Sequence, residues 1–435
     1  MGTVAADMKV LVIGGGGREH ALAWRLAESP RVTALFAMPG NPGIAQVADC
    51  IPGDPMDFKA VARMVRLNAI DFVVIGPEDP LAAGLADHLM AAGVKVFGPT
   101  KDAAQIEADK WFAKELMRQQ AVPTAEARSF TDPSAAEEYV RKHQGSVVIK
   151  ASGLAKGKGV TIARNTAEAI EAINLIMRQK SFGAAGERVV IEEMLRGPEC
   201  SILAFVDNKN IYLMEPAQDH KPVDDGDKGP MTGGMGAYTP TPVITDATMR
   251  AVERDVLVPI VDGLVRDGIK YRGVLYAGLM LTLNGPKVLE FNCRFGDPET
   301  QPLMMRLKSD LLEVMLAVAE GNLDKVQLKW DPRPAVCVVA TSKGYPGKYP
   351  TGLPITGIEN ADAMRDVKVF HSGTRMEGDQ LVTDGGRVLG VTAMGDTIAA
   401  AQKRAYDAMK QIHFEGMHYR TDIAHQAIKL EARGE

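Results

Sequence analysis

An alternating stretch in the second half of the chain carries the strongest chemical signal. In LEFNCR, at residues 289–294, side chains two positions apart share a face of a predicted strand, so Glu290 and Asn292 lie together while Leu289 and Phe291 enter the core. A carboxylate and an amide oxygen suit Mg²⁺, which takes few protein ligands and otherwise binds water and nucleotide phosphates. Arg294 continues the alternation and can bind a carboxylate or phosphate through two hydrogen bonds. A polar edge strand would explain the carboxylate alone, but it explains the arginine poorly.

A second candidate site follows the first predicted strand. The apolar run KVLVI leads into four consecutive glycines and then into Arg18, Glu19 and His20 at the start of a predicted helix. Glycines let backbone N–H groups approach a phosphate or carboxylate, and the helix N-terminus adds partial positive charge. The segment is not a dinucleotide-binding fingerprint, because Glu19 stands where G-x-G-x-x-G needs its last glycine. A tight strand-to-helix turn without a ligand stays open as the alternative.

A loop that contains glycines and lysines joins two predicted antiparallel strands. It includes Lys156, Gly157, Lys158 and Gly159, and Lys150 ends the strand before it. It is not a Walker A loop, because the spacing is one residue short, Gly159 replaces Ser or Thr, and a strand follows instead of a helix. Such a loop can still fold over nucleotide phosphates. A solvated basic hairpin is the alternative, and the loop taken alone favours it.

Acidic residues follow other predicted strands. Glu78 comes after the third strand of the first region, where ligands of open parallel sheets bind, and could hold a hydroxyl or an amine. Glu192 and Glu193 end a later strand and Glu199 follows them, so they could accept hydrogen bonds from an adenine amino group or ribose hydroxyls. A solvated turn carboxylate and carboxylates at a helix start are the respective alternatives.

A long polar, glycine-rich connection spans residues 218–238 and includes Asp219 and His220. Connections of this length in compact chains are either functional or disordered, and we expect a lid or substrate loop. The acidic residues at 224–227 lack the alternating spacing of a calcium-binding EF-hand loop.

The elements that must position these residues fall into successive regions. Residues 9–97 alternate short apolar runs with amphipathic helices, which predicts βαβ units on a parallel sheet. One long helical region is expected at 102–120, followed by a hairpin-containing lobe. A mixed region with antiparallel strands comes next, and short strands with a helix at 397–411 end the chain.

Composition excludes several classes of protein. The 435 residues are too many for a single hydrophobic core, so the chain must fold as several domains. The net charge of -5 argues against nucleic acid as the main partner. No run of about 18 uninterrupted apolar residues is present, so we expect no membrane interaction and a cytoplasmic location. The cysteines are far apart and form no C-x-x-C pair, which predicts neither a zinc site nor disulfides. Cys293 is expected to be a small buried hydrophobe.

The ordered motifs resemble the glycinamide ribonucleotide synthetase family of the ATP-grasp superfamily over nearly the whole chain. GGREHAL, PGNPG, IGPEDPL, VFGPT, KASGLAKGKGV, VIEE, QDHKPV, TGGMGAY, EFNCRFGDPETQ and SKGYPGKY follow one another as in the family. The resemblance implies an N-terminal open parallel α/β sheet, a two-lobed ATP-grasp core and a small C-terminal mixed β domain. The expected boundaries are 1–108, 109–333 with a lid lobe at about 122–193, and 334–435.

The resemblance also implies roles for individual residues. It implies ATP near Lys110, Lys150, Lys156, Gly157, Lys158, Gly159, Glu192, Glu193 and Glu199. It implies Mg²⁺ or Mn²⁺ on Glu290 and Asn292. It implies phosphoribosylamine near Gly17, Arg18, Glu19 and Glu78, and glycine with the reacting amine near Asp219, His220 and Arg294. Lys150, Asp219, His220 and Arg294 would then be catalytic.

The implied reaction activates the glycine carboxylate as glycyl phosphate, which the amine of phosphoribosylamine converts to an amide in purine biosynthesis. The expected partners are these small molecules, and the expected state is a monomer or homodimer. Other readings are a different grasp ligase or carboxylase, a formate-using transformylase, or an ATP-binding sensor. Two positions depart from the family, which commonly has asparagine at Gly15 and at Met231, and the leading MGTVAAD precedes the usual family start.

Overall fold

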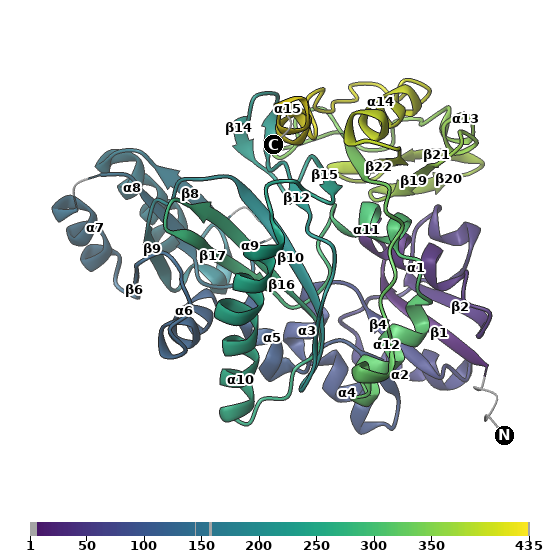
Figure 1. Ribbon diagram of the computed structural model, residues 1–435, viewed down its shortest axis with the longest axis horizontal. Coiled ribbons are helices and arrows are strands. Elements are labelled where there is room, and N and C mark those ends of the chain that lie inside the picture. Colours follow the sequence, from purple (N-terminus) through teal and green to yellow (C-terminus); the bar gives the residue numbers. More distant parts are fainter. Residues whose placement is uncertain (1–6, 144, 156–158, 434–435) are drawn as a thin grey trace.

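The computed structural model describes residues 7–143, 145–155 and 159–433. Figure 1 shows an N-terminal α/β unit, a lobe that extends to the opposite side, a central sheet between them and a C-terminal unit above the N-terminal one. Within the described residues, no helix is long and apolar enough to cross a membrane.

The N-terminal unit is the predicted parallel sheet. Its strands are β1 (Met8–Gly14), β2 (Val32–Pro39), β3 (Asp49–Cys50), β4 (Phe72–Ile75) and β5 (Lys95–Phe97), in the order β3-β2-β1-β4-β5. All of their pairings are parallel. The helices are α1 (Gly17–Leu26), α2 (Phe58–Leu67), α3 (Glu78–Ala83) and α4 (Leu85–Ala91). Because β1 and β4 are neighbours, α1 and α3 start at the same edge of the sheet, which brings Arg18 towards Glu78.

The long helical region predicted at 102–120 is present, but a break divides it into two helices. It forms α5 (Lys101–Ala108) and α6 (Lys110–Gln119), separated at Asp109. The Asp109 carboxylate accepts hydrogen bonds from the Trp111 N–H at 2.9 Å and the Ser152 hydroxyl at 2.7 Å. Asp109 therefore caps α6 and ties it to the next lobe, which outweighs continuing the helix.

The lobe at the left of Figure 1 is an antiparallel sheet covered by helices. It contains β6 (Ala127–Phe130), β7 (Val147–Ala151), β8 (Val160–Ala163) and β9 (Val189–Glu193), in the order β6-β9-β7-β8. Its helices are α7 (Pro133–Lys142) and α8 (Thr166–Ile173), the latter with a π-helical extension at Asn174–Arg178. The predicted β7–β8 hairpin is confirmed by the pairing of Val147 with Ala163.

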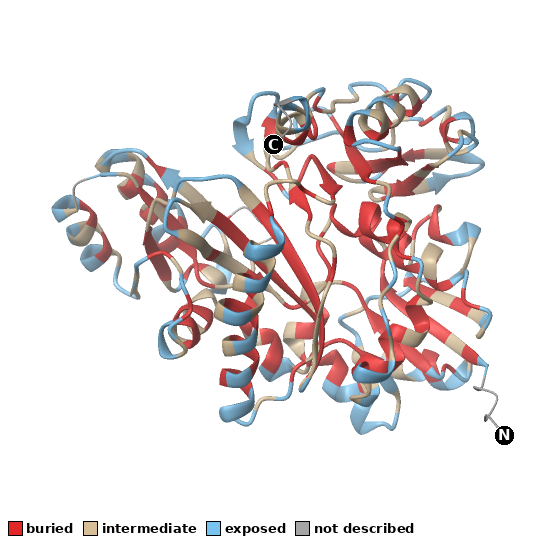
Figure 2. Ribbon diagram, viewed as in Figure 1, coloured by how far each residue is buried: buried red, intermediate tan, exposed pale blue. Residues whose placement is uncertain are grey.

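The central sheet contains β10 (Glu199–Asp207), β11 (Ile211–Leu213), β16 (Arg272–Thr282) and β17 (Gly285–Asn292), in the order β11-β10-β16-β17. Its helices are α9 (Asp246–Val252), α10 (Val258–Arg266), α11 (Thr300–Arg306) and α12 (Leu311–Glu320). Figure 2 shows buried residues along the middle of β10 and β16. A register shift opposite Leu289 interrupts the alternation of β17, so Leu289 is partly exposed, while Phe291 enters the core as predicted.

The C-terminal sheet has the order β12-β15-β18-β22-β19. Its strands are β12 (Gln218–Asp219), β15 (Gly236–Thr239), β18 (Ala335–Thr341), β19 (Val367–His371) and β22 (Arg387–Met394). The hairpins β13 (Pro222–Asp224) with β14 (Lys228–Met231) and β20 (Thr374–Glu377) with β21 (Gln380–Thr383) flank it, together with α13 (Ile358–Asp362), α14 (Ile398–Met409) and α15 (His425–Arg433). The polar connection at 218–238 thus contributes strands to this sheet.

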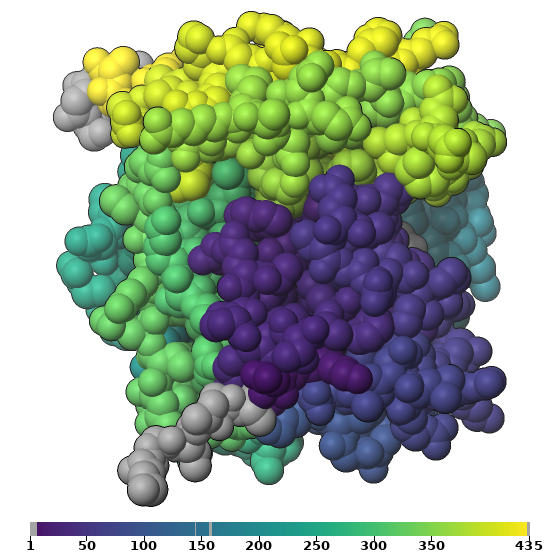
Figure 3. Space-filling view, turned by 90° about the vertical axis from the view of Figure 1, so that its right-hand side faces the viewer, coloured from purple at the N-terminus to yellow at the C-terminus, as the bar shows by residue number. Residues whose placement is uncertain are grey.

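The C-terminal unit packs directly on the N-terminal one, as the space-filling view in Figure 3 shows. The backbone N–H of His371 donates to His20 Nδ1 at 2.8 Å, and the Asn41 amide donates to the carbonyls of Gly15 and His371, both at 2.9 Å. These hydrogen bonds join β19 to α1 through His20 and to the segment after β2 through Asn41.

Candidate active site

A cavity of about 550 Å³ lies where the units meet. Arg18 and Glu78 reach it from the N-terminal unit, Lys150 from the lobe and Arg387 from the C-terminal unit. Other charged lining residues come from α5, α6 and the strands of the lobe and the central sheet: Glu107, Lys110, Lys114, Glu192, Glu193, Glu199 and Glu290. Further ones come from β12 and the residue two positions after it, and from the segment after β17: Asp219, Lys221, Arg294, Asp297 and Glu299. Converging charges of both signs in one concave site indicate a polar, charged small-molecule ligand.

Lysines and a buried carboxylate form one end of the cavity. Lys150 Nζ lies 2.9 Å from Glu192 Oε2 and donates to the carbonyl of Leu289 at 3.0 Å. Lys114 Nζ lies 3.2 Å from the other oxygen of Glu192, and burial lowers the pKa of Lys114 to about 8. The Glu192 carboxylate is therefore engaged by two lysines, and the sequence did not single out Lys114.

Lys110 faces the same end. Its Nζ donates to the carbonyl of Gly153 at 3.4 Å, and burial lowers the pKa of Lys110 although Glu290 opposes this shift. Lys110 and Lys150 thus supply two cations to this end of the cavity, which Glu290 of β17 also lines.

Glu290 is an ionised carboxylate among cations. Burial acts to raise its pKa, but Lys221, Lys150 and Lys110 outweigh burial and hold the pKa of Glu290 at about 2. Lys221 Nζ lies 3.7 Å from Glu290 Oε1 and 3.2 Å from Glu199 Oε2. Lys221, which the sequence did not single out, therefore bridges the carboxylates expected at the metal and at the ribose.

The amide of Asn292 is oriented by Glu107. Hydrogen bonding assigns the amide nitrogen to the side of Glu107, where it donates to Oε1 at 3.1 Å and to the carbonyl of Phe291 at 3.3 Å. The amide oxygen is consequently turned away from Glu107. Glu107 is nine-tenths buried and was also not singled out in the sequence.

The donor set at Glu290 and Asn292 fits a nucleotide-bound Mg²⁺. In the described part of the chain, no group of three or more His, Cys, Asp or Glu side chains is arranged to hold a metal ion. An all-protein cage is therefore not indicated. One ionised carboxylate and one correctly oriented amide oxygen are the kind of incomplete set that Mg²⁺ completes with phosphates and water.

Two arginines share Glu78 at the other end of the cavity. Arg294 Nε lies 3.2 Å and Arg18 Nη1 lies 3.7 Å from Glu78 Oε2. Arg294 is also held by Glu107 Oε1 at 2.7 Å and by the carbonyl of Phe295 at 3.1 Å, and Arg18 shares that carbonyl at 3.2 Å. This arrangement leaves a positive wall suited to a phosphate or carboxylate.

The rest of the glycine loop does not line the cavity. Glu19 Oε2 accepts the Gly16 N–H at 2.8 Å and its Oε1 lies 2.6 Å from Arg18 Nε, so Glu19 caps α1 and holds Arg18. A Cβ at Gly17 would lie 2.5 Å from Ser372 Oγ, and one at Gly15 would lie 2.4 Å from the carbonyl oxygen of Gly40. The loop is tightly packed, and Gly15 has no room for a larger residue here.

The adjacent residues Asp219 and His220 separate. Asp219 lines the cavity, and burial together with Glu299 raises the pKa of Asp219 well above its usual value. His220 does not line it: its Nε2 accepts the Ala424 N–H at 3.3 Å, and burial lowers the pKa of His220 to about 4. The predicted pair is therefore split: β12 ends at Asp219, and the side chain of the next residue, His220, packs against Ala424 instead of the cavity.

The remaining predicted nucleotide residues lie along the lobe. Glu193, Glu199 and Gly159 line the cavity, as does Met231 from β14. Glu193 Oε1 is engaged by Lys287 Nζ at 2.9 Å and by the Glu126 N–H at 3.1 Å. The predicted residues Lys156, Gly157 and Lys158 lie outside the described residues.

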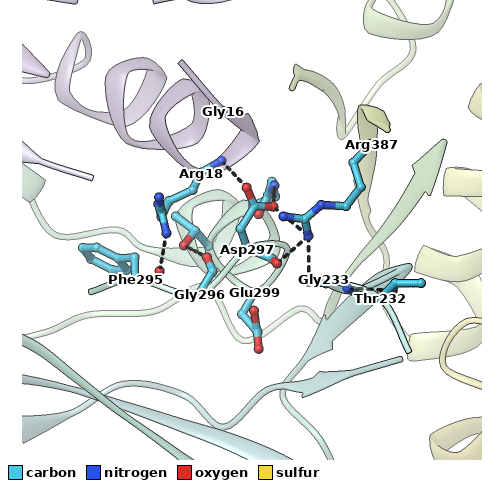
Figure 4. A network of polar contacts seen from close by, with 12 residues as sticks. Gly16, Arg18, Thr232, Gly233, Phe295, Gly296, Asp297, Glu299 and Arg387 are labelled. Atoms are coloured by element: carbon cyan, nitrogen blue, oxygen red, sulfur yellow. Dashed lines mark hydrogen bonds and ion pairs between the residues drawn. The ribbon is translucent and has the colours of Figure 1, made fainter. Parts of the chain in front are cut away.

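Asp297 connects three units at the floor of the cavity (Figure 4). Its Oδ2 accepts the backbone N–H of Arg18 at 3.2 Å, and its carbonyl accepts from Arg387 Nη1 at 2.6 Å. The turn formed by Gly296, Asp297 and Pro298 after a strand was visible in the sequence. The hydrogen-bond partners of Asp297, however, are 279 and 90 residues away along the chain. No local pattern could have identified them.

Three family models match consecutive parts of the chain. They are the phosphoribosylglycinamide synthetase N domain at residues 8–107, the ATP-grasp (A) domain at 108–300 and the C domain at 335–426.

Relatives match over nearly the full length. The chain is 51% identical over 426 residues to a phosphoribosylamine–glycine ligase of Rhodopirellula baltica, covering 96% of this chain and 98% of the relative. It is 50% identical over 424 residues to one of Agrobacterium fabrum, covering 98% and 100%. A crystal structure of the Thermotoga maritima phosphoribosylamine–glycine ligase superposes with a TM-score of 0.83 at 32% identity, covering 96% of this chain and 100% of that one.

Proposed function

Because the chain belongs to the phosphoribosylglycinamide synthetase family of ATP-grasp ligases, we propose that it joins glycine to phosphoribosylamine through glycyl phosphate. The products are glycinamide ribonucleotide, ADP and phosphate. The observation that carries this proposal is that phosphate-binding cations, a metal-compatible carboxylate and amide, and a second cationic wall line one cavity.

ATP occupies the part of the cavity between the lobe and the central sheet. Lys110 and Lys150 neutralise its phosphates. Glu192 and Glu193 line the end that binds adenine, where Glu192 is held in place by its ion pair with Lys150. Glu199 accepts hydrogen bonds from the ribose hydroxyls. Phosphoryl transfer depends mainly on such positioning and charge neutralisation.

Mg²⁺, or Mn²⁺ in its place, is held by Glu290 and Asn292. The ion would neutralise charge on the transferred phosphoryl group when bound. Glu290 stays ionised because Lys221, Lys150 and Lys110 lower its pKa, and Glu107 holds the Asn292 amide with its oxygen outward. Both residues are therefore prepared for a cation before ATP arrives.

Arg294, Arg18 and Glu78 form the substrate end. Arg294 holds the glycine carboxylate as it attacks the γ-phosphoryl group, while Glu78 and Arg18 bind phosphoribosylamine, with Gly17 and Glu19 supporting Arg18 from the helix start. Asp219, whose pKa burial raises, accepts a proton from the attacking amine. His220 acts on the site only through the backbone that joins it to Asp219.

The same proposal divides the chain into an N-terminal domain at 1–108, an ATP-grasp domain at 109–333 with its lid lobe at about 122–193, and a C-terminal domain at 334–435. Enclosure between these parts protects the acyl phosphate from water. Nucleic acid has no role in this reaction, and a monomer or homodimer suffices because every proposed residue belongs to one chain.

The test is a coupled assay with purified protein, Mg²⁺, ATP, glycine and freshly generated phosphoribosylamine. We expect ADP release that needs all of the components, with amide product formed in equal amount. Glycine-independent ADP release, or ADP release without an amide product, would contradict the proposal.

A further inference from the structure

The backbone of Gly233 is held from both sides by the C-terminal unit. Its N–H donates to the hydroxyl of Tyr345 at 3.1 Å, and its carbonyl accepts from Arg387 Nη1 at 2.8 Å. Gly233 and Arg387 both line the cavity, and Figure 4 shows the arginine reaching Gly233 and Asp297 together. One peptide unit of the cavity wall is thus fixed by two side chains from distant parts of the sequence.

The two side chains are themselves firmly placed. A Cβ at Gly386 would lie 2.3 Å from the ring of Tyr345, so the ring packs against the residue that precedes Arg387. Arg387 Nη1 also donates to the Asp297 carbonyl at 2.6 Å and lies 3.6 Å from Asp297 Oδ1. Tyr345 and Arg387 therefore form one unit, here called the Gly233 clamp.

The clamped segment supports Asp219. The Gly234 N–H donates to Thr232 Oγ1 at 2.9 Å, and Gly234 has a φ of +116°, a conformation that L side chains rarely adopt. A Cβ on Gly234 would lie 2.4 Å from Pro298 Cδ and 2.7 Å from Asp219 Oδ1. The backbone at 233–234 is therefore the wall against which the Asp219 carboxylate rests, and a shift of Gly233 would move that wall.

We propose that Tyr345 and Arg387 are positioning residues for the ligation, which act by fixing the Gly233 peptide and through it Asp219. The inference rests on the proposed function, in which Asp219 serves the reacting amine. It assigns the C-terminal unit an indirect part in the ligation: Tyr345 and Arg387 hold the cavity wall at the amine, while the nucleotide end belongs to the two grasp lobes.

The proposal predicts which kinetic constants change. Tyr345→Phe removes one hydrogen bond to an uncharged N–H, and we expect about a fivefold fall in kcat/KM for phosphoribosylamine. In Arg387→Lys the ammonium lies one bond short of the Nη1 atom that donates to both carbonyls, and we expect a fall of about tenfold or more. The KM for ATP should stay within about twofold in both variants, because the clamp does not touch the nucleotide end.

Matched controls exist in the same unit. Tyr349→Phe alters a tyrosine whose ring lies 6.4 Å from that of Tyr345, and Arg375→Lys alters a partly exposed arginine on β20. Both controls should keep wild-type kinetics. The double variant Tyr345→Phe/Arg387→Lys should lose less than the product of the two single losses, because both act through one peptide unit.

The experiment is steady-state kinetics for all three substrates on wild type, the two variants, their double and the two controls, with melting temperatures alongside. If Arg387→Lys melts well below wild type, its kinetic loss reflects lost stability, and the kinetics of Tyr345→Phe alone test the clamp. Variants that match the controls, or that raise the KM for ATP as much as that for phosphoribosylamine, overturn the clamp. Wild type that forms no amide overturns the proposed function itself.

Discussion

Glu107 Oε1 lies 2.7 Å from Arg294 Nη2, and the other oxygen of the same carboxylate accepts the backbone N–H of Cys293 at 2.8 Å. With the Asn292 amide at 3.1 Å, one buried side chain of α5 orients three consecutive residues at the end of β17. Burial raises the pKa of Glu107, and Arg294 opposes that shift. The metal-binding and substrate-binding ends of the cavity thus share a single support.

Glu107→Gln should impair both ends, because it removes the charge that pairs with Arg294. It also turns an amide donor either towards Arg294 and the Asn292 amide nitrogen, which share Oε1, or towards the backbone N–H of Cys293 at Oε2. We expect kcat/KM for glycine to fall by about 10- to 100-fold, together with weaker Mn²⁺ binding in the presence of nucleotide. Electron paramagnetic resonance titration of Mn²⁺ measures the second effect independently of turnover. The control is Glu320→Gln, a surface carboxylate paired with Lys95 at 2.6 Å. Normal Mn²⁺ affinity in Glu107→Gln would show that Glu107 does not orient Asn292.

Glu290→Ala should abolish turnover, because the metal loses its anionic ligand. The change also leaves Lys221 with Glu199 as its remaining close carboxylate partner among the described residues. Steady-state activity and Mn²⁺ titration on folded protein check this outcome. Near-normal activity would overturn the assignment of the metal to β17.

Asp219→Asn should lower kcat, whereas His220→Gln should lower the melting temperature, although the two residues are adjacent. Asp219→Asn removes the proton acceptor from the cavity wall, and we expect kcat to fall by about 100-fold or more. His220→Gln changes a side chain that faces Ala424 and Tyr238, so we expect a lower melting temperature with kcat within about threefold of wild type. Comparable losses of kcat in the two variants would place His220 in the chemistry after all.

Buried histidines between the N-terminal and C-terminal units should make stability fall in acid. Burial, with Lys368, lowers the pKa of His371 to about 4, while an unfolded chain titrates near 6.5. The neutral form is favoured in the folded protein, so this contribution is complete above pH 6.5 and is lost as the pH falls through about 4. Its full size is about 3 kcal/mol.

His371→Gln should therefore lose less melting temperature between pH 7 and pH 5 than wild type does. Part of the acid sensitivity should remain, because burial also lowers the pKa values of His20 and His220. The exposed His413→Gln is the matched control, and calorimetry across this pH range is the measurement. Equal pH dependence in His371→Gln and His413→Gln would contradict the assignment.

Much of the fold could be predicted because it follows local periodicity. The apolar runs alternating with amphipathic helices predict the parallel sheet at 9–97, and two apolar runs joined by a glycine-containing loop predict the β7–β8 hairpin. The break at Asp109 could not be predicted in this way, since its reason is a hydrogen bond to Ser152 in another lobe. The strands of the polar connection at 218–238 likewise depend on pairing with β18, about 100 residues later.

The site residues that could be predicted are likewise those that belong to a local sequence pattern. Glu290, Asn292 and Arg294 could be grouped because strand alternation places them on one side, and they do line one cavity. Glu107, Lys221 and Arg387 were missed because their partners lie on other elements and carry no local pattern. His220 was grouped with Asp219 through the family resemblance, but its side chain contacts Ala424 and Tyr238 instead of the cavity.

The most direct test of the central claim uses glycine labelled with heavy oxygen in its carboxylate. In the proposed reaction a carboxylate oxygen attacks the γ-phosphorus, and the amine later displaces phosphate from the acyl carbon, so that oxygen leaves with the phosphate. Mass spectrometry of the products should find one labelled oxygen in each inorganic phosphate and the other in the amide carbonyl. Amide product accompanied by unlabelled phosphate would contradict activation through glycyl phosphate.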